Sequence, residues 1–385
     1  MARNKTVVSV AGIDPFRIGG GETFARELSR QLGILGWRSV LCYLNPPAGK
    51  VREFLELPNV DLEVLPDAWR PGWRQTRGLA AILRRHRPEI LHLHFTSFLG
   101  PYPWIAALLG VRRIFFTDHS SRPEGYQRRR APLWKQLATR AINSPIERVT
   151  CPSDYGVSCW RELGVLPPAR FVRIYNSVDL TRPEGDGASF RRRWSISVDK
   201  LIVLQVSWII PEKGIGDLLE AARRVVEKEP RAHFVFAGEG AAREQFTEEA
   251  ARMWLERRVT WTGLLLDPWT EGAYAAADVV CQVSRWEEIF GWSIAEAMAA
   301  GRPVVGTRVG GIPEVIEDGR TGFVVPRGDV TAIASGILSL LSDPGLRTSM
   351  GRQGRAAAER KFDLARNVAG LLRLYGLSSS FDSAG

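Results

Sequence analysis

The chain has 385 residues, of which 45% are hydrophobic and 24% are charged, a composition that predicts a soluble globular protein with room for two domains. The formal net charge is +10, but almost all basic residues are arginine, which suggests a general preference for arginine as much as a functional patch. The chain has no zinc-ligand spacing, RNA-binding signature or basic heptad helix, so we expect no nucleic-acid partner. No apolar run approaches the roughly 18 residues that span a bilayer.

Four cysteines lie in or beside apolar runs without a C-x-x-C motif: Cys42, Cys151, Cys159 and Cys281. This pattern predicts buried free thiols in a reducing cytosol. The N-terminal apolar stretch, residues 7–13, stops at Asp14-Pro15 and is too short for the core of a signal peptide. We therefore expect a cytoplasmic protein, unless a surface feature holds it to the inner face of a membrane.

In the first half of the chain, short apolar runs alternate with helical patterns. Strands are predicted at residues 7–13, 40–44, 60–65, 90–95, 114–117, 149–151 and 172–175. Helices are predicted over residues 24–35, 76–86, 103–109 and 134–143. This alternation predicts a parallel sheet that is covered on both faces.

The segment 181–199, which is polar and contains Pro and Gly, is predicted to be an irregular linker. The alternation then restarts, with strands predicted at residues 201–206, 233–237, 259–262, 279–283, 304–307 and 322–325. Helices are predicted at residues 216–228, 241–257, 330–341, 344–360 and 364–375, and the tail from Leu377 is predicted to be disordered. The fold class is therefore α/β with two doubly wound domains, and the expected ligand site is the cleft between them.

The stretch from Ser284 to Val305 carries the clearest chemical signal. Glu288 and Glu296 are eight residues apart, and Glu296 is the only carboxylate in an apolar helical run. A buried carboxylate needs a hydrogen-bonding partner, because an unpaired one costs several kcal/mol or takes up a proton. A ligand with hydroxyl groups would supply that partner, and a neighbouring loop would supply it equally well.

Three strand-to-helix loops are rich in glycine or charge. Gly19-Gly20-Gly21 is a loop whose amides can approach a phosphate or sugar, and the segment 207–214 places Lys213 where it can reach a phosphate. The third loop, residues 237–240, has space for a nucleotide. For each loop a purely structural turn, or a solvated lysine, is the competing interpretation.

Histidines lie near the ends of two predicted strands. His92 and His94 alternate and therefore face the same side, where one is expected to be a packed core histidine. His119 follows the strand 114–117, at the end where active-site groups collect. No histidine has the spacing of a metal site, so we expect no metal.

Together these motifs resemble the retaining glycosyltransferases of the GT-B fold, and family 4 in particular, over nearly the whole chain. The most specific part is the family's Glu-x7-Glu signature, here Glu288 and Glu296. Supporting motifs are Asn176-Ser177-Val178-Asp179, Pro211-Glu212-Lys213-Gly214, Gly238-Glu239-Gly240, Gly310-Gly311-Ile312-Pro313-Glu314 and Asp318-Gly319 with Thr321-Gly322.

The resemblance implies two Rossmann-like domains that face each other across a cleft. It implies a domain 1–180 that binds the acceptor, with the helix 361–377 packing back on it, and a domain 181–360 that binds the nucleotide-sugar. The implied catalytic residues are His119, which would line the reaction centre, Glu288, which would contact hydroxyl groups of the donor sugar, and Lys213, which would neutralise the diphosphate.

The resemblance also implies a wider nucleotide-sugar site. Glu296 would accept hydrogen bonds from the ribose, and a glycine loop of the first domain would close on the diphosphate. The complete implied set is Gly20, Gly21, Ser207, Lys213, Gly238, Glu288, Phe290, Gly291 and Glu296.

The implied reaction moves a sugar, with retention, from a nucleotide-diphospho-sugar to a saccharide or lipid-linked acceptor. Neither a metal nor another cofactor is expected, because positive side chains and helix dipoles would stabilise the leaving diphosphate. The leaving phosphate itself would take the proton of the acceptor.

Three positions depart from the family pattern. Ser207-Trp208 stands where the family usually has Gly-Arg, so one arginine of the diphosphate clamp is missing unless Arg285 or Arg308 replaces it. Ser177 and Trp292 also replace common family residues. The missing arginine keeps a non-catalytic nucleotide-sugar-binding subunit open as an alternative. A nucleotide-sugar epimerase on the same fold is a second alternative.

Two segments of the first half combine arginine with tryptophan, namely residues 69–74 and Arg128-Arg129-Arg130 with Trp134. Such combinations are typical of surfaces that bind anionic membranes. The alternative is that the tryptophans pack inward.

Overall fold

The computed structural model describes residues 4–377, which form two compact units. The N-terminal unit comprises residues 4–120, 127–176 and 364–377, and the C-terminal unit comprises residues 121–126 and 177–363. Residues 121–126 belong to the C-terminal unit because Arg122 and Glu287 exchange two backbone hydrogen bonds, of 2.9 and 2.8 Å. A boundary drawn at a single position near residue 180 does not include this excursion. The tail 378–385, predicted to be disordered, lies outside the described residues.

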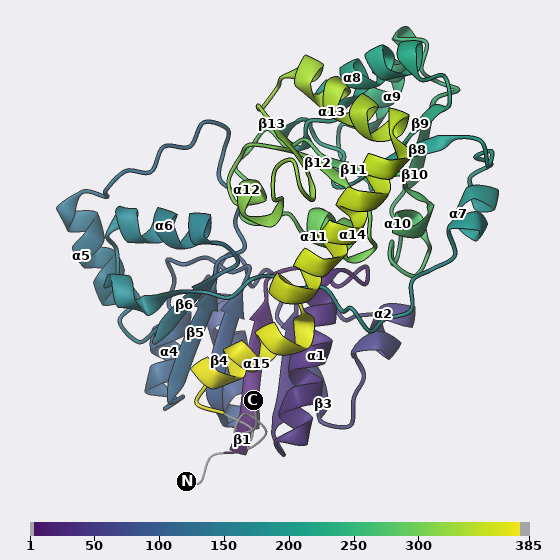
Figure 1. Cartoon of the computed structure of the whole chain (residues 1–385). Coiled ribbons are helices and arrows are strands. Elements are labelled where there is room, and N and C mark those ends of the chain that lie inside the picture. Colours follow the sequence, from purple (N-terminus) through teal and green to yellow (C-terminus); the bar gives the residue numbers. More distant parts are fainter. Residues whose placement is uncertain (1–3, 378–385) are drawn as a thin grey trace. The chain divides into compact units, whose positions relative to one another are not determined.

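The N-terminal unit is built on a seven-stranded parallel sheet with the order β3-β2-β1-β4-β5-β6-β7 (Figure 1). The strands are β1 (Asn4–Ala11), β2 (Arg38–Tyr43), β3 (Val60–Val64), β4 (Pro88–His94), β5 (Arg113–Thr117), β6 (Arg148–Cys151) and β7 (Phe171–Arg173). Its helices are α1 (Gly20–Ile34), α2 (Gly49–Leu55), α3 (Trp73–His86), α4 (Tyr102–Leu108), α5 (Leu133–Ile142), α6 (Asp154–Leu163) and α15 (Leu364–Leu374), with a 3-10 turn η1 (Pro168–Arg170).

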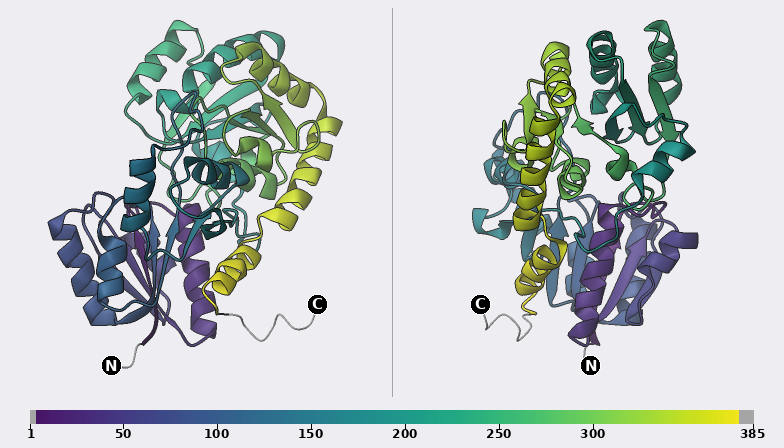
Figure 2. Two further views of the ribbon diagram at one scale, coloured as in Figure 1. Left: turned by 90° about the vertical axis from the view of Figure 1, so that its left-hand side faces the viewer. Right: turned by 45° about the vertical axis from the view of Figure 1, so that its right-hand side comes forward.

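Helices cover both faces of this sheet, as the alternating pattern predicts. One core joins Val8 and Val10 of β1 to apolar side chains of α3, α4 and α6. The other core joins Val7 to α1 and to α15, which runs beside α1 (Figure 2). All four cysteines are buried and free, as predicted.

The C-terminal unit repeats the architecture with six parallel strands in the order β10-β9-β8-β11-β12-β13. The strands are β8 (Leu201–Val206), β9 (Ala232–Ala237), β10 (Val259–Gly263), β11 (Val279–Gln282), β12 (Val304–Thr307) and β13 (Gly322–Val325). Its helices are α7 (Gly187–Arg193), α8 (Ile215–Lys228), α9 (Arg243–Arg252), α10 (Ala273–Ala276), α11 (Trp292–Ala299), α12 (Ile312–Val315), α13 (Val330–Ser342) and α14 (Pro344–Lys361), with a 3-10 turn η2 (Pro211–Lys213).

Both sheets have the doubly wound arrangement, because the chain reverses its direction of growth once in each. The reversal falls between β1 and β4 in the first sheet and between β8 and β11 in the second. Ligands of such sheets bind beyond the carboxyl ends of the strands at this point. Among the described helices, none is both long and apolar enough to cross a bilayer.

The predicted linker 181–199 is partly helical, which corrects the expectation of an irregular segment. Asp186 caps α7 by accepting hydrogen bonds from the amides of Ala188 and Ser189, both 3.0 Å long. Phe190 is 1% exposed and anchors the helix. The hydrophobic pattern of the sequence did not predict α7, because one buried side chain in seven residues gives no periodicity.

Candidate active site

The loops that follow β8 and β11 form the centre of the candidate site in the C-terminal unit. They begin at Ser207 and Val283, at the carboxyl ends of the two strands between which the sheet reverses. Lys213 lies in the first loop and Glu288 in the second. The fold therefore brings together two residues that are 75 positions apart in the chain.

Glu288 is 5% exposed and accepts four hydrogen bonds. Its Oε1 atom lies 2.6 Å from Lys213 Nζ, and its Oε2 atom accepts a bond of 3.2 Å from Ser121 Oγ. Ser284 Oγ and Trp286 Nε1 donate to Oε1 over 2.5 and 2.9 Å. These donors provide the polar environment that a buried carboxylate requires.

The charge state of Glu288 follows from these contacts. Burial alone would raise the pKa of Glu288, but the positive charge of Lys213 and the hydrogen bonds from Lys213, Ser284 and Trp286 lower this pKa below its ordinary value. Glu288 is thus ionised at neutral pH. Its partner Lys213 also lies 4.7 Å from the centre of the Trp286 ring, a cation–π distance.

Contacts with its backbone fix the loop that carries Lys213. The side-chain amide of Gln205, on β8, donates a hydrogen bond of 2.9 Å to the carbonyl of Lys213. The next residue, Gly214, has φ +70°, and a Cβ atom there would lie 1.9 Å from the carbonyl oxygen of Val283. Only glycine fits this position, because the loops after β8 and β11 touch through their backbones.

The other glycine motifs make similar close approaches. A Cβ atom on Gly238 would lie 1.9 Å from the carbonyl oxygen of Ser207, and one on Gly310 would lie 1.9 Å from that of Glu288. Glu287 accepts a hydrogen bond of 2.7 Å from the Gly310 amide and pairs with Arg327 at 2.8 Å. The loops after β8, β9, β11 and β12 are therefore locked around Glu288.

Glu296 differs from the sequence expectation in its environment. It is partly exposed rather than buried, and it accepts a hydrogen bond from the phenol of Tyr274. A neighbouring segment of the protein, the short helix α10, thus supplies a partner, as in the structural alternative. Phe290, by contrast, is 1% exposed and packs edge-on against Phe362, while Gly291, with φ +106°, is the N-cap residue that precedes α11.

In the N-terminal unit, Gly20 and Gly21 are the first two residues of α1 and not a free loop. The helix begins there because the buried Glu22 accepts a hydrogen bond of 3.1 Å from the Gly19 amide, which caps the first turn. Burial raises the pKa of Glu22.

Three of the histidines in the first unit, His92, His94 and His119, form one cluster. His92 is fully buried and bonds Thr117 Oγ1 at 2.7 Å and the hydroxyl of Tyr375, which confirms it as a packed core histidine. His94 Nδ1 lies 3.3 Å from His119 Nε2, and His119 stacks on Phe95 at 4.0 Å. Burial and the nearby His92 lower the pKa of His119 to about 3, so His119 is neutral at pH 7.

Both candidates for the missing arginine, Arg285 and Arg308, form ion pairs with carboxylates. Arg285 contacts Asp217 at 3.2 Å and Glu124 at 3.5 Å. Arg308 pairs with Asp318 at 3.3 Å. Trp208, at the family's arginine position, is 48% exposed. Within residues 4–377, no group of three or more His, Cys, Asp and Glu side chains is placed to hold a metal ion.

Two partners in the site carried no signal in the sequence. Ser121, which donates to Glu288, belongs to the excursion 121–126, and Tyr274, which donates to Glu296, lies on the short α10. Ser284 and Trp286 stand inside the signature stretch, but the sequence analysis did not single them out as partners of Glu288.

Two doubly wound parallel sheets, with a buried lysine–glutamate pair in the loops at the carboxyl edge of the second, are the features of an enzyme with the GT-B fold. Comparison with known proteins identifies the family. Residues 18–182 match the model of Glycosyltransferase Family 4, and residues 187–357 match that of Glycosyl transferases group 1. The chain belongs to this family of group 1 glycosyltransferases and is a glycosyltransferase, as the sequence predicts.

Relatives and solved structures agree with this assignment. The alpha-D-kanosaminyltransferase of Streptomyces kanamyceticus is 34% identical over 77% of this chain and 80% of that protein. The N-acetyl-alpha-D-glucosaminyl L-malate synthase of Bacillus anthracis is 30% identical over 74% and 73%. A glycosyltransferase from Rickettsia africae has the same fold, with a TM-score of 0.77 at 19% identity, covering 97% of this chain and 98% of that one. The structure of Anabaena Alr3699/HepE in complex with UDP matches with a TM-score of 0.76 at 18% identity, covering 96% and 99%.

Proposed function

We propose that this glycosyltransferase takes its sugar from a nucleotide-diphospho-sugar and transfers it, with retention and without a metal, to a saccharide or lipid-linked acceptor. The observation that carries the proposal is the buried pair of Lys213 and Glu288 at the point where the second sheet reverses. A cation next to an ionised acceptor of hydrogen bonds matches a ligand that has both phosphate and hydroxyl groups.

Each side chain has a separate task in this proposal. Lys213 balances the charge that develops on the leaving diphosphate, and Glu288 orients the sugar through its hydroxyl groups. The leaving phosphate oxygen takes the acceptor's proton, so no side chain has to act as a base. Glu296 binds the ribose, and the backbone around Ser207, Gly238, Phe290 and Gly291 shapes the donor pocket. His119, Gly20 and Gly21 keep the roles that the family resemblance implies.

Relatives support a nucleotide-sugar donor but differ in the base. One, from Mycolicibacterium smegmatis, is named as a GDP-mannose-dependent mannosyltransferase, whereas the Anabaena protein was solved with UDP-glucose. We therefore expect one of the UDP-, GDP-, ADP- and dTDP-sugars to raise the melting temperature of this protein, because a ligand of the native state stabilises it by mass action.

The test continues with turnover of the stabilising donor, with and without EDTA, and with NMR of the anomeric proton of the product. Retention and unchanged turnover in EDTA are expected. Inversion, or loss of activity that added divalent ions restore, contradicts those parts of the proposal. If the protein binds the nucleotide-sugar tightly but neither transfers nor hydrolyses the sugar, the result favours the alternative of a non-catalytic nucleotide-sugar-binding subunit.

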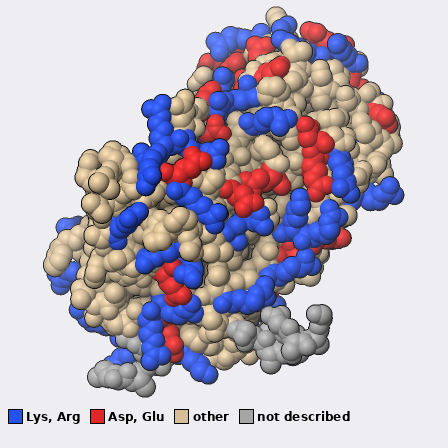
Figure 3. All heavy atoms as spheres, turned by 60° about the vertical axis from the view of Figure 1, so that its left-hand side comes forward, with Lys and Arg blue, Asp and Glu red and all other residues tan. Residues whose placement is uncertain are grey.

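We also propose a cytoplasmic location with peripheral attachment to an anionic membrane. On α4 and α5, large apolar side chains face the solvent, and Trp104 Nε1 ties the two helices together by donating to the carbonyl of Ala141 over 3.0 Å. We call this set the α4–α5 surface: Trp104, Leu108, Leu133, Trp134 and Leu137. Trp73 and Trp134 are 75% and 71% exposed, which speaks against inward packing. On the face drawn in Figure 3, blue Lys and Arg groups alternate with red groups and wide tan areas, so no single basic patch competes with this surface there.

The membrane proposal predicts that the protein sediments with phosphatidylglycerol vesicles at low salt, because exposed tryptophan and leucine insert at the interface while nearby arginines pair with the lipid. Replacing Trp134 and Leu137 by serine should remove most of the bound fraction. Trp254→Ser is the matched control, since Trp254 is 87% exposed in the C-terminal unit. Absence of binding by the wild type, or equal losses in both variants, would refute the proposal.

A further inference from the structure

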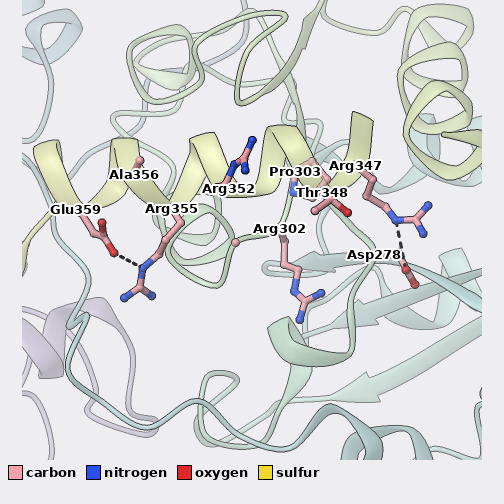
Figure 4. Close-up of a pocket in the computed structure, with 10 residues that line it drawn as sticks. Asp278, Arg302, Pro303, Arg347, Thr348, Arg352, Arg355, Ala356 and Glu359 are labelled. Atoms are coloured by element: carbon pink, nitrogen blue, oxygen red, sulfur yellow. Dashed lines mark hydrogen bonds and ion pairs between the residues drawn. The ribbon is translucent and has the colours of Figure 1, made fainter. Parts of the chain in front are cut away.

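The C-terminal unit has a cavity that lies away from the candidate active site. It has a volume of about 550 Å³ and is formed by one face of α14, the loop Gly301–Pro303 and Asp278 (Figure 4). Asp278 immediately precedes β11 and Pro303 immediately precedes β12. The cavity is therefore at the amino-terminal edge of the sheet, whereas Lys213 and Glu288 are at the carboxyl edge.

Four arginine residues line this cavity. Arg347, Arg352 and Arg355 come from α14, and Arg302 comes from the loop before β12 (Figure 4). Two carboxylates, Asp278 and Glu359, also line it. Among the lining residues the positive charges exceed the negative ones by two, while the carboxylate of Glu184, outside the lining, also interacts with Arg302 and Arg355. The volume suits a small ligand.

The carboxylates are committed to partners in the protein. Asp278 accepts a hydrogen bond of 2.8 Å from the amide of Ile202 and pairs with Arg191 at 3.4 Å and Arg347 at 3.6 Å. Glu359 pairs with Arg355 at 2.7 Å. Arg347 and Arg355 thus serve the structure of the protein, and Arg347 also donates to the carbonyls of Leu340 and Leu341.

The other two arginines retain capacity for a ligand. Arg302 donates one bond of 2.8 Å, from Nη2 to the carbonyl of Ala275, but its buried Nε atom has no hydrogen-bond partner among the described residues. Arg352 is exposed, and over residues 4–377 its side chain forms no ion pair or hydrogen bond. A buried N–H group without an acceptor is costly, so an anion at this position would be stabilising.

The loop side of the cavity is rigid. Gly301 has φ +66°, and a Cβ atom on Gly351 of α14 would lie 2.0 Å from the carbonyl oxygen of Gly301. Arg355 adds a hydrogen bond to the carbonyl of Ala299, at the end of α11. Arg302 is therefore held on a fixed backbone opposite α14, which favours binding because little has to be ordered when the ligand arrives.

We propose that this cavity is a binding site for a small phosphorylated metabolite, a phosphate monoester of the size of a sugar phosphate, separate from the donor site. Guanidinium groups match the oxygens of a phosphate, and Thr348 offers its hydroxyl group to the same ligand. Figure 4 draws the side chains of Arg302 and Arg352 pointing in different directions, so the exposed Arg352 side chain turns toward Arg302 when both contact one phosphate. The site requires no metal and does not depend on the proposed transfer reaction.

Isothermal titration with ribose 5-phosphate as the probe tests this site. The wild type should bind one equivalent saturably, and Arg352→Gln should weaken binding by about tenfold, the effect of losing one charge-assisted contact. The double variant Arg302→Gln/Arg352→Gln should abolish it. Arg252→Gln is the matched control, because Arg252 is an exposed helical arginine of the same unit, and it should bind as the wild type does.

Lys213→Ala separates this site from the donor site. It should leave the binding of ribose 5-phosphate intact, while the arginine variants should leave the binding of the nucleotide-sugar intact. Absence of saturable binding in the wild type overturns the proposal. Unchanged binding of ribose 5-phosphate by Arg352→Gln also overturns the proposal. So does equal weakening of that binding in Arg252→Gln, because it would mean that any lost positive charge has the same effect. Arg352 is at an exposed helical position, so Arg352→Gln is expected to fold even if the double variant does not.

Discussion

Lys213→Ala is expected to lower the turnover of the nucleotide-sugar by a factor on the order of 10² to 10³, the effect of removing one preorganised group that stabilises developing charge. The expectation is strong here because Trp208 stands at the family's arginine position and because Arg285 and Arg308 are engaged elsewhere. Release of the nucleotide from a labelled donor measures the effect.

Two variants sharpen this result. Lys200→Ala is the control, since Lys200 belongs to the same unit and pairs only loosely, at 3.7 Å, with Asp199; it should retain full turnover. Trp208→Arg in the Lys213→Ala background should recover part of the activity, because it returns a cation to the position where the family has one. Turnover near that of the wild type in Lys213→Ala would show that Lys213 is not the clamp.

The sheets were predictable from the sequence because most of their strands are buried on both faces. A strand of this kind gives an uninterrupted apolar run such as 201–206, which the structure reproduces as β8 (Leu201–Val206). Where polar residues begin a strand, the run starts late: β1 begins at Asn4 and not at Val7. The end of a strand depends on its hydrogen bonds to the neighbouring strand, and an apolar run in the sequence does not contain that information.

Short helices escaped prediction for a different reason. Helix α2 has only two buried side chains, Val51 and Leu55, and α6 is recognisable mainly by its caps at Ser153 and Gly164. Such helices are held by caps and tertiary packing more than by amphipathic periodicity. An apolar pattern alone cannot report them.

Candidate residues of the site could be named from the sequence, but their contacts could not. The signature stretch identified Glu288, and the loop after β8 identified Lys213, yet nothing in the sequence indicated that the two form an ion pair at 2.6 Å. Their approach depends on Gly214, whose backbone meets that of Val283, and on Ser121 from the excursion 121–126. Contacts between distant loops depend on the order of the strands in the sheet. That order can be predicted from the sequence only after the fold class has been assigned.

Glu288→Gln is expected to abolish transfer and to destabilise the protein by about 3 kcal/mol at pH 7, because it leaves the charge of Lys213 without its counterion in a nearly dry environment. The two side chains are only 12% and 7% exposed, so water cannot replace the lost partner. Urea denaturation at pH 7 measures the loss. Glu256→Gln, at an exposed position of the same unit, should change stability by less than about 0.5 kcal/mol.

The pH dependence of that difference identifies its origin. The pKa of Glu288 is lower in the folded protein than in the unfolded chain, where a glutamate titrates near 4.3. The stabilisation by its charge is therefore complete above the unfolded pKa and is lost as the pH falls through the folded pKa. Between pH 7 and pH 3 the wild type should lose stability relative to Glu288→Gln, and the gap between their unfolding free energies should narrow. A constant gap would mean that the variant acts through packing, and that the charge of Glu288 does not stabilise the fold.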